Sequence, residues 1–171
     1  MDQPSASFIP AADKICDKSR LMQRAAQWRA HGETLVFTNG CFDLLHVGHV
    51  MSLEYARRAG DRLIVGLNGD QSVQRLKGLA RPVVTENERA FILAALGCVD
   101  AVIVFAEDTP LSILEWLKPD VLVKGGDYRE EQVVGREIVQ AYGGRILIAP
   151  FIPNRSTTSL ITRLNRGDRP E

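Results

Sequence analysis

Two histidines in the first third of the chain are spaced to bind one phosphate group. The segment 38–49 has the sequence TNGCFDLLHVGH, so that His46 and His49 lie three residues apart. If a helix begins here, both imidazoles lie on one face and can reach the same ligand. Gly48 between them lets a phosphate approach the backbone, and the N–H groups of a helix start attract anions. We therefore predict a nucleotide triphosphate site in which both imidazoles stabilise charge developing on the α-phosphate.

Two other interpretations of these histidines fit their surroundings less well. They could serve as a helix cap and a core partner, but the pattern directly follows a β-rich run and a glycine turn. A zinc site would need a third ligand, and His31 lies before that run, at its far end. We expect no metal ligands from the protein itself, and Mg²⁺ bound mainly through the nucleotide phosphates.

A cluster of hydroxyl side chains near the C-terminus is the second candidate phosphate site. Residues 154–159 have the sequence NRSTTS and precede a predicted helix. Such a run usually provides only a helix cap. Together with the histidine loop, however, it predicts that Ser156, Thr157 and Thr158 hold β- and γ-phosphate oxygens.

Basic residues between the two candidate sites could neutralise a pyrophosphate leaving group. Lys77 and Arg81 lie in a glycine- and proline-containing stretch, and Arg89 lies on the helix predicted to follow it. Cations of this kind are usually solvated, and Arg89 could instead form an ion pair with Glu86 or Glu88. We favour phosphate binding for Lys77 and Arg89, with closure of the stretch over the ligand.

The elements that must position these residues alternate between strands and helices. Continuous apolar runs predict buried strands at 34–38, 62–67, 101–105, 121–123 and 145–149. Helices are predicted at 13–30, 48–59, 85–96, 110–117, 131–142 and 157–165, with at most a short helix within 68–84. The predicted fold is α/β: a single Rossmann-like domain with a five-stranded parallel sheet and helices on both faces. Residues 1–12 are expected to form a loose N-terminal arm, and residues 13–171 the domain.

Ligands of such sheets bind beyond the carboxyl ends of the strands, which adds further candidates. The fourth strand ends in Lys124, two glycines and Asp127, and the glycines permit close approach to a base or ribose. Asp43 could order the first loop by accepting its N–H groups, or contact metal-bound water, and we favour the first. The predicted nucleotide-binding residues in these loops are Asn39, Gly40, Cys41, Phe42, Gly48, Lys124, Gly126 and Asp127, and the predicted substrate-binding residues are Asp43, Asn68, Asp70 and Arg155.

The composition argues against several classes of function. Lys and Arg number 21, as do Asp and Glu, so there is no basic excess for binding nucleic acid or a membrane surface. Three cysteines without a CxxC pair fit a reducing compartment. The N-terminus lacks an apolar signal segment, and no apolar run approaches the ~20 residues that span a bilayer. We expect a cytoplasmic protein.

The motifs together resemble a known family. Residues 40–49, GCFDLLHVGH, are similar to the signature of the HxGH nucleotidyltransferase superfamily, in its cytidylyltransferase-like branch, and the hydroxyl cluster is similar to a second signature. With N-x-D at 68–70, KGxxRP at 77–82, Glu88-Arg89 and LVKGGDY at 121–128, the set resembles the nucleotidyltransferase domain of bacterial ADP-heptose synthesis over residues 17–164.

This resemblance implies a reaction and several site roles. The reaction is adenylyl transfer from ATP to D-glycero-β-D-manno-heptose 1-phosphate, which yields ADP-heptose and pyrophosphate for lipopolysaccharide core synthesis. Lys77 and Arg89 match family positions that contact phosphates. A homo-oligomer is implied, and because the chain is too short for the sugar kinase that many bacteria fuse to this domain, so is the stand-alone form.

Two rival functions stay open at this point. A cytidylyltransferase acting on glycerol 3-phosphate or another polyol phosphate shares the first loop. A nucleotide-binding sensor without catalysis would keep ligand affinity but release no pyrophosphate.

Overall fold

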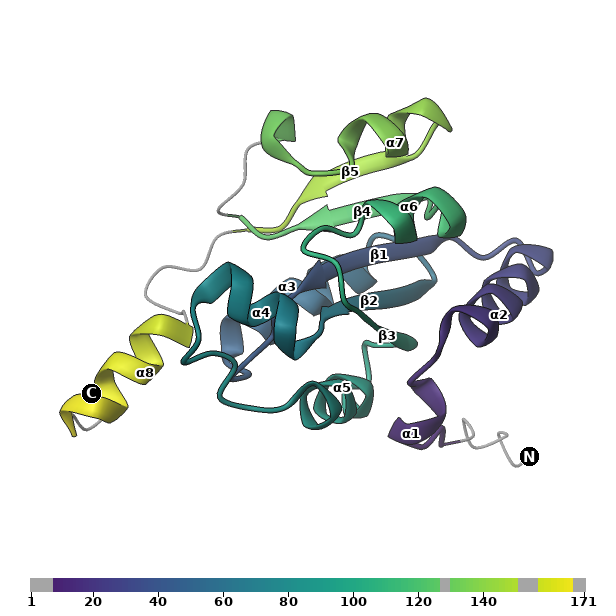
Figure 1. Cartoon of the computed structure of the whole chain (residues 1–171). Coiled ribbons are helices and arrows are strands. Elements are labelled where there is room, and N and C mark those ends of the chain that lie inside the picture. The colour runs from purple at the N-terminus through teal and green to yellow at the C-terminus, as the bar shows by residue number, and fades with distance from the viewer. Residues whose placement is uncertain (1–7, 127–129, 151–156, 168–171) are drawn as a thin grey trace.

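A single parallel sheet forms the centre of the molecule. The computed structural model describes residues 8–126, 130–150 and 157–167 (Figure 1). The strands are β1 (Leu35–Gly40), β2 (Arg62–Asn68), β3 (Ala101–Phe105), β4 (Val121–Lys124) and β5 (Arg145–Ile148). All pair in parallel, in the order β3-β2-β1-β4-β5. The predicted five-stranded parallel sheet is therefore confirmed.

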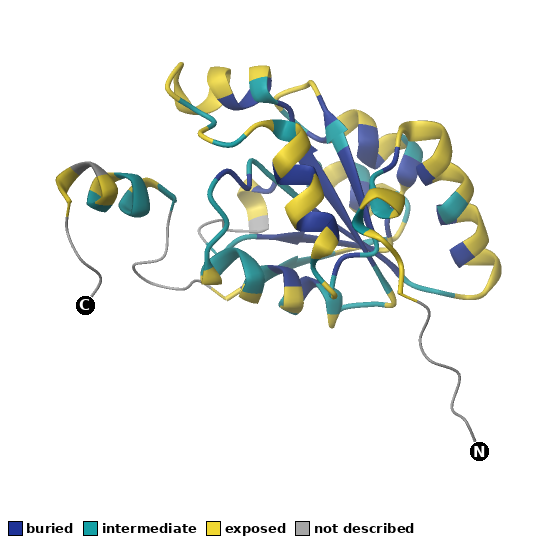
Figure 2. Cartoon of the chain, turned by 90° about the horizontal axis from the view of Figure 1, so that it is seen from below, coloured by how far each residue is buried: buried dark blue, intermediate teal, exposed yellow. Residues whose placement is uncertain are grey.

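Helices bury both faces of the sheet. Side chains alternate along each strand, so Leu35 and Phe37 enter one core while Val36 enters the other. The first core lies under α2 (Lys18–Ala30), α6 (Leu111–Leu117) and α7 (Arg136–Ala141), and the second under α3 (Val47–Arg57) and α5 (Glu86–Ala95). Figure 2 shows the buried strands between helices whose outer surfaces are exposed. This double burial explains why the strand sequences are continuously apolar.

The remaining elements are short or peripheral. They are α1 (Ala11–Lys14), α4 (Asp70–Lys77), the 3₁₀ turn η1 (Glu130–Gln132) and α8 (Thr157–Arg166). The helix predicted at 85–96 is confirmed as α5 with its capping box, in which Thr85 and Glu88 satisfy each other's backbone N–H groups. No helix in the described ranges is both long and apolar enough to cross a membrane.

Two predicted helices differ from the structure. The segment predicted as one helix at 13–30 is two, because Ile15 forms a parallel bridge with Val102 and Asp17 then caps α2 through the Arg20 N–H at 2.8 Å. Ala11 and Ala12, expected in the loose arm, belong to α1, and residues 1–7 lie outside the described residues.

The helix predicted at 131–142 is also divided. Gly135 has a φ of +92°, in the left-handed region that favours glycine, and it separates η1 from α7. The helix proper therefore begins at residue 136.

The order of strands locates the crevice where a ligand is expected. β1 pairs with β2 on one side and with β4 on the other, so the chain changes direction across the sheet between β1 and β4. In open α/β sheets, ligands bind at the carboxyl ends of the strands that flank this switch point. Asn39 near the end of β1 and Lys124 at the end of β4 lie there.

Candidate active site

The histidine pair lies at the start of α3, directly after the loop that follows β1. His46 is the N-cap residue, and its ring stacks on His49 with centroids 3.8 Å apart and an interplanar angle of 22°. The Phe42 ring packs edge-on against the His49 ring, with the two ring centroids 5.3 Å apart. Phe42 has a φ of +42°, and a Cβ at Gly40 would lie 3.1 Å from its ring. The tight loop thus packs an aromatic ring beneath the histidines.

The environment of His49 keeps its imidazole neutral. Burial, reinforced by His46, lowers the pKa of His49 from 6.5 to about 4. Among the residues that the structure describes, the buried His49 Nδ1 has no hydrogen-bond partner. A neutral ring donates one hydrogen bond and can respond to charge that appears on a bound phosphate.

We expect the free energy of unfolding to decrease as the pH falls below 6.5, because the pKa of His49 is lowered in the native state. The native pKa lies below the unfolded value, so above pH 6.5 the contribution of this residue is constant. As the pH falls from 6.5 towards 4, the unfolded chain takes up a proton that the native state refuses, at a cost of roughly 3 kcal/mol. Urea unfolding at pH 7 and pH 4 should show this loss in the wild type and a smaller one in His49→Asn. Equal losses in both proteins would contradict this assignment.

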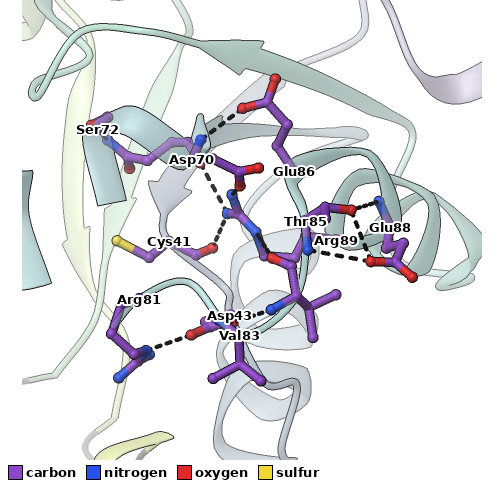
Figure 3. Close-up of polar contacts among 12 residues, drawn as sticks. Cys41, Asp43, Asp70, Ser72, Arg81, Val83, Thr85, Glu86, Glu88 and Arg89 are labelled. Atoms are coloured by element: carbon purple, nitrogen blue, oxygen red, sulfur yellow. Dashed lines mark hydrogen bonds and ion pairs between the residues drawn. The ribbon is translucent and has the colours of Figure 1, made fainter. Parts of the chain in front are cut away.

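Asp43 fixes the loop to the segment before α5. Its Oδ1 accepts the N–H groups of Val83 at 2.8 Å and Val84 at 3.0 Å, and its Oδ2 accepts Arg81 Nε at 2.5 Å (Figure 3). Burial alone would raise the pKa of Asp43, but the hydrogen bonds from Val84, Val83 and Arg81 outweigh it and lower the pKa. Asp43 thus accepts N–H groups of the segment before α5 rather than those of its own loop, and both carboxylate oxygens are occupied.

We expect Asp43→Ala to destabilise the protein by about 3 kcal/mol. The side chain of Asp43 is completely buried, so its removal leaves two backbone N–H groups and Arg81 without their acceptor. Asp43→Asn is the matched control, since it keeps one acceptor oxygen, and it should lose about 1 kcal/mol. Urea unfolding at pH 7 measures both. An alanine variant as stable as the wild type would show that the clamp contributes little.

Arg89 lies inside the protein rather than in the crevice. Its side chain is fully buried, and its Nη2 pairs with Asp70 Oδ1 at 2.6 Å. An ion pair with Glu86 or Glu88 was the alternative drawn from the sequence, and those partners are wrong. Glu86 instead accepts the Asp70 N–H at 2.6 Å, and Glu88 belongs to the capping box.

The side chains of Asn68 and Asp70, predicted to bind substrate, are directed at protein groups. Asn68 is buried, and its amide donates to Ser72 Oγ at 3.0 Å and to the Glu107 carbonyl at 3.4 Å. The Asp70 carboxylate is engaged by Arg89. These contacts anchor α4 to the segment after β3 and to α5.

Two lysines bring positive charge to the candidate site from different elements. Lys77 is exposed at the end of α4. Its positive charge acts to lower the pKa of the Cys41 thiol in the histidine loop. Lys124 is buried, and its Nζ donates to Asn39 Oδ1 across the switch point. Burial raises the pKa of Cys41, so the thiol stays protonated and is not a nucleophile at neutral pH.

The start of α8 lies beside the histidine loop. Thr157 Oγ1 donates to the Leu44 carbonyl at 3.5 Å, although the two residues are far apart in sequence, and Thr158 is exposed next to it. The structure therefore places Thr157, one residue of the hydroxyl cluster, against the loop that leads to the histidines. Gly48 lies in the first turn of α3, and Gly126 in the turn after β4. The predicted residues Asp127, Arg155 and Ser156 lie outside the described residues.

One contributor to this arrangement was missed from the sequence. Glu86 accepts the first N–H of α4 from across the chain, 16 residues away. A helix-capping partner is normally sought within three residues, so no local signal pointed to it.

Within the described ranges, no group of three or more His, Cys, Asp or Glu residues could hold a metal ion. The first aspartate of the loop, Asp43, has both oxygens occupied by protein donors. The described residues therefore do not provide a ligand set for a resident metal.

A Rossmann-like parallel sheet with an HxGH loop at its switch point defines the class as an α/β nucleotidyltransferase. The family model described as cytidylyltransferase-like matches residues 37–162. The chain belongs to the cytidylyltransferase-like family.

Curated relatives match most of this chain with only part of their own length. "Bifunctional protein HldE" of Magnetococcus marinus is 53% identical over 154 residues, which cover 90% of this chain and 32% of that protein. The protein of the same name from Syntrophotalea carbinolica is 59% identical over 136 residues, 80% of this chain and 28% of that protein. The chain thus spans about a third of the length of these relatives.

Solved structures agree with the fold. A lipopolysaccharide core biosynthesis protein from Thermoplasma volcanium has a TM-score of 0.60 and 28% identity, and covers 71% of this chain and 99% of its own. A pantoate-beta-alanine ligase from Francisella tularensis, with a TM-score of 0.56 and 16% identity, covers 84% of this chain and 68% of its own and shares the fold alone.

Proposed function

We propose that this chain transfers an adenylyl group from ATP to D-glycero-β-D-manno-heptose 1-phosphate, giving ADP-heptose and pyrophosphate. The observation that carries the chemistry is the stacked pair of histidines at a helix start beside the switch point. The neutral His49 imidazole, the His46 ring stacked on it and the helix N–H groups gathered there suit an α-phosphate that gains charge during transfer.

The reaction needs no strong general base. An oxygen of the sugar phosphate is already an anion, and it attacks the α-phosphorus of ATP in line with the departing group. One P–O bond forms to that oxygen, while the bond between the α-phosphorus and the bridging oxygen breaks and pyrophosphate leaves. His46 and His49 stabilise charge on the α- and bridging oxygens. Lys77 and the hydroxyls of Thr157 and Thr158 hold the leaving pyrophosphate.

Mg²⁺ is expected to enter with the nucleotide. Small hard cations commonly bind through phosphates and a few waters, and they neutralise phosphate charge when bound. The described residues present no ligand set of their own. The steps assigned above to the histidines, Lys77 and the hydroxyls do not depend on one.

The choice of adenine and heptose rests on likeness rather than on the site geometry. The segments N-x-D at 68–70, KGxxRP at 77–82 and LVKGGDY at 121–128 resemble the nucleotidyltransferase domain of bacterial ADP-heptose synthesis. The similarity to proteins named HldE, and to a lipopolysaccharide core biosynthesis protein of solved structure, supports the same choice.

A matrix of substrates tests the proposal. Pyrophosphate release is measured with Mg²⁺ and either ATP or CTP, each combined with heptose 1-phosphate or glycerol 3-phosphate. We expect release only with ATP and the heptose phosphate. Release only with CTP and the polyol phosphate would replace the substrate assignment by that of a cytidylyltransferase. Nucleotide binding without release in any combination would favour a sensor.

A further inference from the structure

The guanidinium of Arg89 contacts four places in the chain that surround the candidate site. Its Nη1 donates to the carbonyl of Cys41 at 2.5 Å and to that of Asn68 at 2.9 Å. Its Nε donates to the Val84 carbonyl at 2.9 Å, and its Nη2 to Asp70 Oδ1 at 2.6 Å. The partners lie in the histidine loop, at the end of β2, in the segment before α5 and at the start of α4. Figure 3 shows Cys41 and Asp70 beside the Arg89 side chain.

This geometry leaves little of Arg89 for a ligand. A guanidinium has five N–H groups, and these four contacts direct most of them at protein acceptors. The side chain has no exposed surface. Three of its acceptors are neutral carbonyls arranged around a planar fork, a pattern that a lysine ammonium does not reproduce.

Arg89 and Asp43 both form hydrogen bonds with the backbone of Val84. Asp43 Oδ1 accepts the Val84 N–H, and Arg89 Nε donates to the Val84 carbonyl, so both sides of this residue are held. Arg89 also donates to the Cys41 carbonyl, two residues before Asp43, so the same guanidinium contacts the histidine loop.

Through Asp70, Arg89 also contacts α4, the helix that carries Lys77. Asp70 is the first residue of α4, and α5 holds it twice, through Glu86 at its N–H and through Arg89 at its carboxylate. Lys77 is the last residue of the same helix. Arg89 is therefore a buried side chain that contacts both the histidine loop and the start of the helix that carries Lys77.

We propose that Arg89 is a positioning residue that couples the Lys77-bearing helix to the histidine loop, and that it does not contact the phosphates. This inference rests on the proposed function, because it assigns Lys77 and the histidines to the transfer. It replaces the phosphate contact that the family resemblance implied for Arg89, and the substrate contact predicted for Asp70.

Arg89→Lys is the first test, because it keeps the positive charge and loses the fork. We expect kcat to fall about a hundredfold, as for other small displacements of catalytic groups. Pyrophosphate affinity should fall by much less than kcat, because Lys77 is displaced but no phosphate ligand is removed. The control is Arg75→Lys on α4, the helix that carries Lys77, where an exposed cation pairs with Asp108 and does not contact Arg89 or its partners, and it should behave as the wild type.

A measurement on the folded variant separates positioning from general stability. By NMR, the pKa of His49 in Arg89→Lys should rise from about 4 towards its ordinary value of 6.5, because the loop that buries the ring is released. A pyrophosphate affinity that falls in step with kcat/KM, with the His49 pKa unchanged, would instead make Arg89 a phosphate ligand. Wild-type turnover in the variant would equally overturn the proposal.

Asp70→Asn gives a second test if the lysine variant does not fold. It keeps an acceptor oxygen but removes the counter-charge of Arg89, and the carboxylate is partly exposed. We expect kcat to fall about tenfold with the KM for the sugar phosphate unchanged. A raised KM at unchanged kcat would show that Asp70 contacts the substrate, and would overturn the assignment.

These outcomes are distinguishable from a failure of the proposed function. The His49 pKa and the pyrophosphate affinity are measured without any sugar phosphate. The kcat comparison uses whichever substrate pair the wild type turns over in the matrix above. An incorrect choice of adenine or heptose would therefore leave the Arg89 result readable.

Discussion

Replacing either His46 or His49 with alanine is expected to lower kcat by about a hundred- to a thousandfold while the fold survives. The two rings are stacked at the start of α3, where a bound α-phosphate would gain charge. Each removal deletes a donor that acts mainly in the transition state, so kcat should fall more than nucleotide affinity.

The chain offers a matched control for this pair. His31 is an exposed histidine at the end of α2, where its Nδ1 contacts the Gln27 carbonyl, far from the loop after β1. His31→Ala should turn over as the wild type does. Circular dichroism and urea unfolding establish that each variant is folded. Near-normal turnover in a folded His46 or His49 variant would remove that residue from the mechanism.

Replacing Lys77 with alanine is expected to lower kcat/KM by about a hundredfold. The ammonium at the end of α4 is exposed and near the histidine loop, where it can neutralise the pyrophosphate that leaves. Its removal should barely change the free energy of unfolding, because an exposed side chain contributes little to stability.

The comparison for Lys77 is made on the same helix. Arg75→Ala removes an exposed cation that pairs with Asp108, and it should leave kcat/KM within about threefold of the wild type. Lys77→Arg, which keeps the charge, should recover part of the loss. If the Lys77 and Arg75 alanine variants were equally active, the lysine would be an ordinary solvated residue at an exposed helix end.

Local and periodic signals predicted the sheet and the candidate phosphate loop. Buried parallel strands require continuous apolar sequence, and the capping box of α5 lies within four residues, so both could be recognised directly. The position of His46 and His49 at a helix start followed in the same way from the strand and the glycine turn before them.

Contacts between distant segments could not be predicted in this way. The bridge between Ile15 and Val102 divides a segment whose own apolar spacing is helical. The partner of Arg89 proved to be Asp70, on another helix 19 residues away, while two glutamates on its own helix were nearer in sequence. Both cases depend on how the elements pack, which periodicity does not report.

The most direct test of the proposed transfer follows the oxygen that the sugar phosphate contributes. Heptose 1-phosphate carrying ¹⁸O in its phosphate is incubated with ATP, Mg²⁺ and the purified wild-type chain, and the products are examined by ³¹P NMR. We expect ADP-heptose with ¹⁸O in the bridge between its two phosphorus atoms, and pyrophosphate free of label. Label in the pyrophosphate, or no ADP-heptose at all, would contradict attack of the sugar phosphate on the α-phosphorus of ATP.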